Sequence, residues 1–212
     1  MDTVEKKDDR EVMHSQEVGS SRLILTLGMA GLLAGLIISG VNLYTRPLIK
    51  ANKEQALTAA IYQVLPGCKE FEALEWEDDR LEPVSGDPGP EVNIYAGFDT
   101  TEQLVGLAIV LEEPGFQDVI QAIFGYEPHD KTVIGYEVLQ SKETPGLGDK
   151  IIKNQEFRSN FDALATTPRI VGVKEGEKSQ SNEVEMITGA TISSKTIVRM
   201  LNNGLGRYRE AL

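Results

Sequence analysis

Two short motifs in the C-terminal half of the chain contain residue types that could hold a phosphate-bearing ligand. The first is Thr188-Gly189-Ala190-Thr191, a tetrapeptide with two hydroxyl groups, followed at once by apolar residues at intervals of three and four. This spacing is typical of a helix with one apolar stripe. The residues of the stripe are Ile192, Ile197, Met200, Leu201, Leu205 and Tyr208.

Thr191 is therefore predicted at or near the N-terminus of this helix. The first backbone N–H groups of a helix lack intrahelical partners and the macrodipole is positive there, so a phosphate group could bind to geometry already in place. Gly189 and Ala190 would let a bulky ligand approach the backbone closely. The alternative is that Thr191 serves only as the N-cap, a role that threonine fills readily.

The second motif, Glu143-Thr144-Pro145-Gly146-Leu147-Gly148, has the composition of a rigid turn. Its proline fixes one backbone dihedral, and its two glycines permit conformations closed to other residues. Alone, it could be a tight loop between a strand and a helix. In this order and at this spacing, however, the two motifs resemble the FMN-binding domain shared by the G subunit of the Rnf electron-transport complex and the C subunit of the sodium-pumping NADH:quinone reductase.

The resemblance implies a cofactor and its site. In that family E-T-P-G-L-G lies upstream of D-x-x-[ST]-G-A-T, and the final threonine carries FMN through a phosphoester bond, which implies covalent FMN on Thr191. The other implied FMN-binding residues are Thr188, Gly189, Ala190, Glu143, Thr144, Pro145, Gly146, Leu147 and Gly148. Glu185 stands where the family usually has an aspartate that helps a separate flavin transferase recognise its target, and it keeps the carboxylate. The similarity covers most of Leu104 to Leu205.

The composition limits the number of domains and the kinds of partner and site that this chain could have. A chain of 212 residues with 41% hydrophobic residues has room for one packed domain with accessory segments. A net charge of -12 argues against a nucleic-acid partner, which needs clustered Lys and Arg. Cys68 is the only cysteine, which excludes an internal disulfide, and His14 and His129 lack the spacing of metal ligands, so we expect no metal site.

The N-terminal part predicts a membrane anchor. Residues 1–21 are polar and rich in charge, which predicts a disordered tail. No charged residue occurs from Leu23 to Tyr44, and a helix of that length spans about 33 Å, so we expect a transmembrane helix at residues 22–44. A cleaved signal peptide is the alternative, but it needs a shorter apolar region and a small-residue cleavage site. Gly31 and Gly35 have the small-xxx-small spacing that lets membrane helices pack closely, so we expect a membrane partner.

The remainder divides into a helical neck and loop at residues 45–90 and an FMN-binding domain at residues 91–212. Helical spacing runs from Arg46 to Leu65, whereas the acidic and then Pro- and Gly-rich stretch from Phe71 to Glu91 indicates a loop. Asp118 to Phe124 fits either a helix or a strand. Strands are predicted at Val92–Phe98, Leu104–Leu111, Thr132–Leu139 and Ile170–Val173, the first two paired as a hairpin, with a helix at Ile151–Ala165 and a polar loop at Lys174–Asn182.

The predicted fold class is α+β, with a single N-terminal transmembrane helix followed by one FMN-binding domain that has a mainly antiparallel sheet and packed helices. The predicted function is that of a membrane-anchored flavoprotein that relays electrons within an Rnf-type ion-translocating oxidoreductase coupling ferredoxin and NAD. The implied partners are the other membrane subunits of such a complex and, for maturation, the flavin transferase. Two alternatives stay open: the C subunit of a sodium-pumping NADH:quinone reductase, and a membrane-tethered binding module without a redox role.

Basic residues flank both ends of the apolar span and do not decide its orientation. The resemblance implies a single-pass protein of the bacterial inner membrane whose FMN domain is extracytoplasmic.

Overall fold

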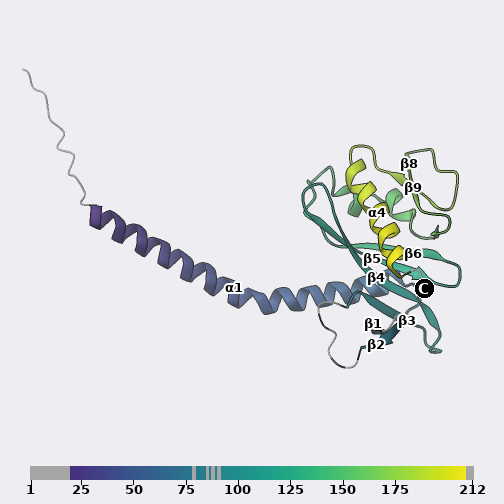
Figure 1. Ribbon diagram of the computed structural model, residues 1–212, viewed down its shortest axis with the longest axis horizontal. Coiled ribbons are helices and arrows are strands. Elements are labelled where there is room, and N and C mark those ends of the chain that lie inside the picture. Colours follow the sequence, from purple (N-terminus) through teal and green to yellow (C-terminus); the bar gives the residue numbers. More distant parts are fainter. Residues whose placement is uncertain (1–19, 78–79, 85, 87–88, 90–91, 209–212) are drawn as a thin grey trace, which may run out of the picture. The chain divides into compact units, whose positions relative to one another are not determined.

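The computed structural model describes residues 20–208 except 78, 79, 85, 87, 88, 90 and 91 (Figure 1). The predicted disordered tail, residues 1–21, lies outside the described residues apart from Ser20 and Ser21, which begin helix α1. The chain divides into two compact units, Met1–Ala51 and Asn52–Leu212, and the division falls within α1 (Ser20–Val64).

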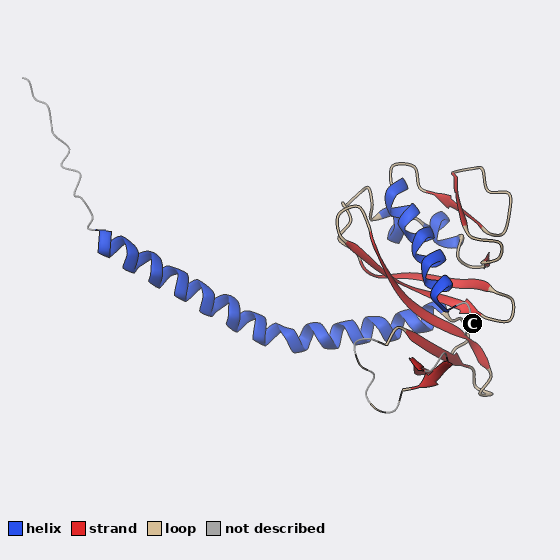
Figure 2. Cartoon of the chain, in the orientation of Figure 1, coloured by secondary structure: helices blue, strands red, loops and turns tan. Residues whose placement is uncertain are grey.

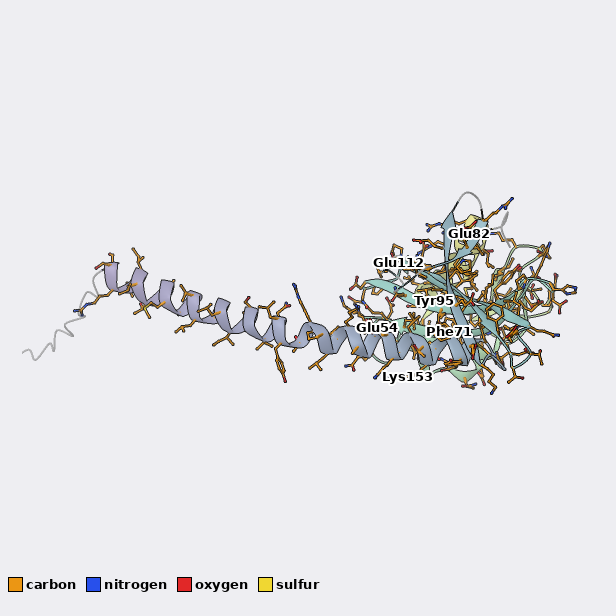
Figure 3. The ribbon with its side chains drawn as sticks, turned by 90° about the horizontal axis from the view of Figure 1, so that it is seen from below. Glu54, Phe71, Glu82, Tyr95, Glu112 and Lys153 are labelled. Carbon is orange, nitrogen blue, oxygen red and sulfur yellow. The ribbon has the colours of Figure 1, made fainter. Side chains whose placement is uncertain are left out.

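The first unit consists, in its described part, of the apolar length of α1. Its large apolar side chains are exposed and project on all sides of the helix (Figure 3). A helix that is apolar all round needs an apolar environment to cover it. α1 is long and apolar enough to cross a membrane, and it is the one such helix among the described residues.

The second unit is built on an antiparallel sheet, whose strands are drawn in red in Figure 2. The sheet has seven strands in the order β2-β1-β3-β4-β5-β6-β7. The strands are β1 (Glu70–Glu77), β2 (Arg80–Pro83), β3 (Ile94–Phe98), β4 (Leu104–Pro114), β5 (Val119–Glu127), β6 (Thr132–Gln140) and β7 (Leu164–Ala165). A separate parallel pair joins β8 (Val171–Lys174) to β9 (Glu183–Met186). The predicted mainly antiparallel α+β fold is confirmed.

Both faces of the sheet are buried, because apolar residues continue on successive positions of the central strands and successive side chains point to opposite faces. One face is covered by α2 (Lys150–Lys153), α3 (Gln155–Ser159) and α4 (Thr191–Tyr208), together with β8 and β9. The other face is covered by the last turns of α1 and the residue that follows, through Ile61, Val64 and Leu65, which are each 0% exposed. Phe71 and Tyr95 meet edge to face on this second side (Figure 3).

The end of α1 packs against a row of four glycines on the sheet, Gly97, Gly106, Gly125 and Gly135. They lie on the neighbouring strands β3, β4, β5 and β6. Gly97 is the cross-strand partner of Gly106, and Gly125 is the partner of Gly135. A Cβ atom on Gly125 or Gly135 would lie 2.8 Å from the carbonyl carbon of Val64. The backbone of the helix end therefore rests directly on the backbone of the sheet, which no other residue type would allow.

Several sequence predictions are confirmed. The hairpin of β3 and β4, the strand leading to the second motif (β6), a strand at β8 and the helix that starts at Thr191 are all present. The ambiguous stretch Asp118–Phe124 belongs to strand β5. The helical spacing from Arg46 to Leu65 corresponds to the second part of α1, which continues through Pro47.

Two predictions about local structure are wrong. The stretch predicted as a loop, Phe71 to Glu91, contains β1 and β2, because Phe71 and Ala73 pack against the core beneath α1 despite their acidic neighbours. The helix predicted at Ile151–Ala165 is instead α2, α3 and the short strand β7. Asn154 breaks it, since its backbone is extended and its side chain caps α3 by accepting the N–H of Phe157. The polar loop predicted at Lys174–Asn182 is present after β8, and it is followed by a strand that the sequence did not predict, β9.

The contact between α1 and the glycines predicts a specific loss of stability. Gly135→Ala should lower the free energy of unfolding of the second unit by about 1–3 kcal/mol, because the added methyl group meets backbone atoms of Val64 that cannot rotate away. Gly172→Ala is the matched control within a strand, since its methyl group meets only the flexible side chain of Met186. Urea unfolding of the full chain in detergent measures both, and equal stability of the two variants would contradict the prediction.

Candidate functional site

The first motif forms the loop that enters α4. The helix begins at Thr191, and the carbonyl oxygen of Ala190 accepts the N–H of Ser194 at 2.9 Å. Ala190 therefore occupies the N-cap position and Thr191 is the first helical residue. The alternative that Thr191 serves as the N-cap is wrong.

Ser194 holds this loop from beneath. Its side chain is fully buried, and its hydroxyl accepts the N–H of Ile187 and donates to the carbonyl of Ala190. Gly189 has a φ of 84°, a left-handed conformation that favours glycine. The turn before Thr191 is thus fixed by the hydrogen bonds of Ser194 and by the left-handed conformation of Gly189.

The two hydroxyl groups of the motif differ in their surroundings. Thr188 donates its hydroxyl to the carboxylate of Glu175 at 2.9 Å. The side chain of Thr191 is exposed, and its hydroxyl has no hydrogen-bond partner among the described residues. Thr191 therefore offers an available hydroxyl beside the unpaired N–H groups of the first turn of α4.

Lys150 adds a positive charge next to the motif, since its ammonium nitrogen lies 3.9 Å from the position that a Cβ atom of Gly189 would occupy. A pocket of about 330 Å³ opens beside Thr188. It is lined by Lys150, Lys153, Asn154, Glu156, Phe157, Glu175, Glu185, Met186, Ile187 and Thr188. The positive helix end and Lys150 together favour an anion at Thr191.

Glu185, the acidic residue six positions before Thr191, has a structural contact. Its carboxylate accepts the backbone N–H groups of Gly176 and Lys178 in the loop after β8. The same loop carries Glu175, which binds Thr188. Glu185 therefore supports the segment that holds the beginning of the motif.

The second motif forms a tight turn whose tip is exposed. The carbonyl of Thr144 accepts the N–H of Leu147, and the carboxylate of Asp149 accepts the N–H of Gly146, which has a φ of 79°. The neighbouring Lys153 ammonium lowers the pKa of Asp149 by its hydrogen bond. Pro145, Gly146 and Leu147 at the tip are available to a ligand, whereas the motif's first and last residues are buried.

Glu143 is the buried residue that joins the second motif to the first turn of α4, directly after the first motif. It is 6% exposed, and one carboxylate oxygen accepts the backbone N–H groups of Phe116 and Gln117 at 2.8 and 3.1 Å. The other oxygen accepts the hydroxyl of Ser193 in the first turn of α4. Glu143 thus connects the loop between β4 and β5, the second motif and the beginning of α4.

Two glycines make room for this carboxylate. A Cβ atom at Gly115 would lie 2.6 Å from one oxygen of Glu143, and a Cβ atom at Gly148 would collide with the other and lie 2.9 Å from the Ser193 hydroxyl. The sequence predicted that the two motifs act together, and the structure joins Glu143 of the second motif to Ser193, two residues after the first motif. It did not identify Phe116, Gln117 or Ser193, which carry no recognisable pattern of their own.

A cluster of Glu127, His129 and Asp130 occupies the turn between β5 and β6. The carboxylate of Glu127 accepts the backbone N–H groups of His129 and Asp130. Asp130 raises the pKa of the exposed His129 by hydrogen bonding to it. These hydrogen bonds stabilise the turn of the hairpin, and this structural role explains why the three residues lie together.

Comparisons with known proteins identify a family model that covers the segment with both motifs. Residues 115–206 match the FMN-binding domain family. The matched segment begins at the loop bound by Glu143 and includes both motifs and most of α4.

Two relatives are similar over nearly the whole chain. The G subunit of an ion-translocating oxidoreductase complex from Methanosarcina acetivorans is 26% identical over 87% of this chain and 92% of the relative. The G subunit of the Na(+)-translocating ferredoxin:NAD(+) oxidoreductase complex from Acetobacterium woodii is 29% identical over 89% of this chain and 91% of the relative. The resemblance to such G subunits that the motifs predict is confirmed.

Two solved structures share the fold. NqrC from Shewanella oneidensis has a TM-score of 0.58 at 15% identity and covers 74% of this chain and 96% of its own. The C subunit of the Na(+)-translocating NADH-quinone reductase from Parabacteroides distasonis has a TM-score of 0.59 at 20% identity and covers 76% and 94%. At these identities the likeness concerns the architecture.

The contacts of Glu143 predict a distinctive pattern of mutant stabilities. Glu143→Ala should be strongly destabilising, because it leaves two backbone N–H groups and the buried hydroxyl of Ser193 without their acceptor. The loss of its partner costs about 1–3 kcal/mol for a buried group such as this hydroxyl. Glu143→Gln should cost much less, since the amide oxygen can accept both N–H groups and the Ser193 hydroxyl can accept from the amide nitrogen.

Adding Ser193→Ala to Glu143→Gln tests this explanation, because it removes the acceptor for the amide nitrogen. Ser193→Ala should cost less beside the neutral amide than beside the carboxylate, because the bond it removes is then no longer charge-assisted. The double variant should therefore be more stable than the sum of the single effects predicts, as measured by urea unfolding in a double-mutant cycle. Strict additivity would indicate that Glu143 and Ser193 do not depend on each other.

Proposed function

We propose that this protein carries FMN covalently on Thr191 through a phosphoester bond and relays electrons as the G-type subunit of an ion-translocating ferredoxin:NAD oxidoreductase. The observation that carries the proposal is the exposed hydroxyl of Thr191 at the first position of α4, which has no hydrogen-bond partner in the described part of the chain. It is joined by the match of residues 115–206 to the FMN-binding domain family.

The residues around Thr191 suit a phosphate group. The N–H groups at the beginning of α4 and the helix macrodipole favour negative charge, and Lys150 adds a cation beside Gly189. Thr188 suits it less well, because its hydroxyl is bound to the carboxylate of Glu175, which would repel a phosphate. These contacts favour Thr191 over Thr188.

The bound FMN would supply the capacity to accept and release electrons. A link through the phosphate fixes one end of the cofactor and leaves the isoalloxazine ring free. In this proposal the ring contacts the exposed tip of the second motif, Pro145 to Leu147, and the hydrogen bonds of Glu143 and Asp149 support the turn that carries this tip. Glu143 itself acts in this proposal by positioning, since protein donors occupy both of its oxygens.

The proposed partners are the other membrane subunits of such a complex and the flavin transferase that attaches FMN. The relatives at 26% and 29% identity are both named as G subunits, which favours this function over that of a sodium-pump C subunit. The apolar first part of α1 supports a membrane location, and we propose a single pass with the FMN domain on the extracytoplasmic side.

The attachment site is tested by paired threonine variants. Thr191→Val keeps the side-chain shape and removes the hydroxyl, so the protein expressed with an active flavin transferase should be folded but carry no covalent flavin. Thr188→Val should retain covalent flavin, because it removes only the bond to Glu175. In-gel flavin fluorescence after SDS denaturation gives the readout, and mass spectrometry of the tryptic peptide locates the modification.

An unmodified Thr191 in the wild-type protein, or FMN mapped to Thr188, would refute the assignment. A wild-type protein that folds, meets its transferase and still shows no fluorescent band would favour the membrane-tethered binding module without a redox role.

The proposed topology predicts the behaviour of reporter fusions at the C-terminus. Alkaline phosphatase, which is active outside the cytoplasm, should be active when fused after Leu212, and green fluorescent protein exported through the same pathway should be dark. Fusions after Ser20, before the apolar span, are the control and should give the opposite result. A fluorescent C-terminal fusion would place the domain in the cytoplasm.

A further inference from the structure

Phe116 is an exposed aromatic residue in the loop between β4 and β5. Its side chain is 63% exposed, and it belongs to neither sequence motif. A single exposed apolar side chain is ordinary in proteins and indicates nothing by itself. What distinguishes Phe116 is how its backbone is held.

The loop of Phe116 is fixed against the site. Its N–H donates to Glu143 at 2.8 Å, and the N–H of Gln117 donates to the same oxygen. The amide side chain of Gln117 also donates to the hydroxyl of Thr144 in the second motif at 3.1 Å. Lys142 pairs with Asp118 and lowers the pKa of that carboxyl, which adds a further link between the loop and the turn.

Two more exposed apolar residues belong to the other segments that meet at Glu143. Leu147 at the tip of the second motif is 52% exposed, and Ile192, the residue after Thr191, is 55% exposed. Each of the three segments joined by the buried carboxylate thus presents a large exposed apolar side chain. Ile192 connects this set directly to the proposed attachment residue.

We infer that Phe116 forms a wall of the surface on which the isoalloxazine ring rests, with Leu147 and Ile192 as its neighbours. The inference rests on the proposed attachment of FMN to Thr191. A planar, largely apolar ring tethered at that residue gains from apolar and aromatic contacts. The hydrogen bonds to Glu143 and Thr144 hold the loop, and with it Phe116, in position to make these contacts.

The pocket beside Thr188 is the competing location for the ring. Five of its ten lining residues, Lys150, Lys153, Glu156, Glu175 and Glu185, carry charged side chains, and Phe116, Leu147 and Ile192 do not line it. Covering charged groups with an apolar ring removes them from water without replacing their hydration. The surface that includes Phe116 is therefore the more favourable one.

A tryptophan introduced at each location distinguishes the two. At contact distance an indole donates one electron to the photoexcited flavin and then recovers it, so the ground state is unchanged and the fluorescence lifetime shortens. The variants are Phe116→Trp for the proposed wall and Met186→Trp for the pocket. Leu104→Trp is the matched control, since Leu104 is 52% exposed and lies at the opposite end of β4, about 33 Å away along the strand.

Covalent flavin is first verified in the full-length wild-type protein and in each variant by in-gel fluorescence. We expect Phe116→Trp to shorten the mean flavin lifetime at least threefold relative to Leu104→Trp, and Met186→Trp to leave it near the control. Phe116→Tyr, a smaller change that also introduces an electron donor, is measured alongside and should shorten the lifetime as well.

Control-like lifetimes in both Phe116 variants, with flavin present, would overturn the inference and leave the proposed function intact. A short lifetime in Met186→Trp alone would move the ring to the pocket. Absence of covalent flavin from the wild-type protein would overturn both the inference and the proposed function.

Discussion

The buried carboxylate of Glu143 is the interaction on which the candidate site depends. A carboxylate removed from water must have its acceptor capacity used by protein donors, because an unpaired buried charge is costly. Its donors come from residues 116, 117 and 193, so segments 26 to 50 positions away in the sequence are held to one side chain. A polar contact, added to the apolar core, fixes the relative placement of the loop, the turn and the beginning of α4.

The rest of α4 reinforces this placement. Thr196 and Arg199 both donate to the carbonyl of Pro114 at the end of β4, and Arg199 also pairs with Glu113. These contacts hold the helix to the strand that leads into the loop of Phe116. The direction of α4, and with it the presentation of Thr191, is therefore set over about two turns. A helix N-terminus can only favour an anion at a defined point when its direction is defined in this way.

The sequence identified the residues of the two motifs but could not reveal the direction of each side chain. Glu143 shows the difficulty, since a carboxylate in a ligand-binding motif can face the ligand or the interior, and only the partners 26 to 50 residues away decide between them. Phe116 and Ser193 were missed for the same reason.

Strand β1 was missed because acidic residues alternate with Phe71 and Ala73, whose burial depends on the end of α1. The break at Asn154 was missed because an asparagine within an apolar periodicity resembles a helical surface residue until its capping contact is seen.

The glycine row on the second face of the sheet has a consequence for the order of assembly during synthesis. Ile61, Val64 and Leu65 leave the ribosome before any strand of the sheet, yet the surface that buries them is completed only when Gly135 on β6 has been made. About seventy residues must therefore be added while these apolar side chains remain without their native contacts, and this long separation slows their docking. If the preceding part of α1 is already in the membrane by then, the emerging strands assemble around a helix end whose position is fixed at one end. The sheet would then form against the last turns of α1, and glycine at those four positions leaves the space that this packing requires.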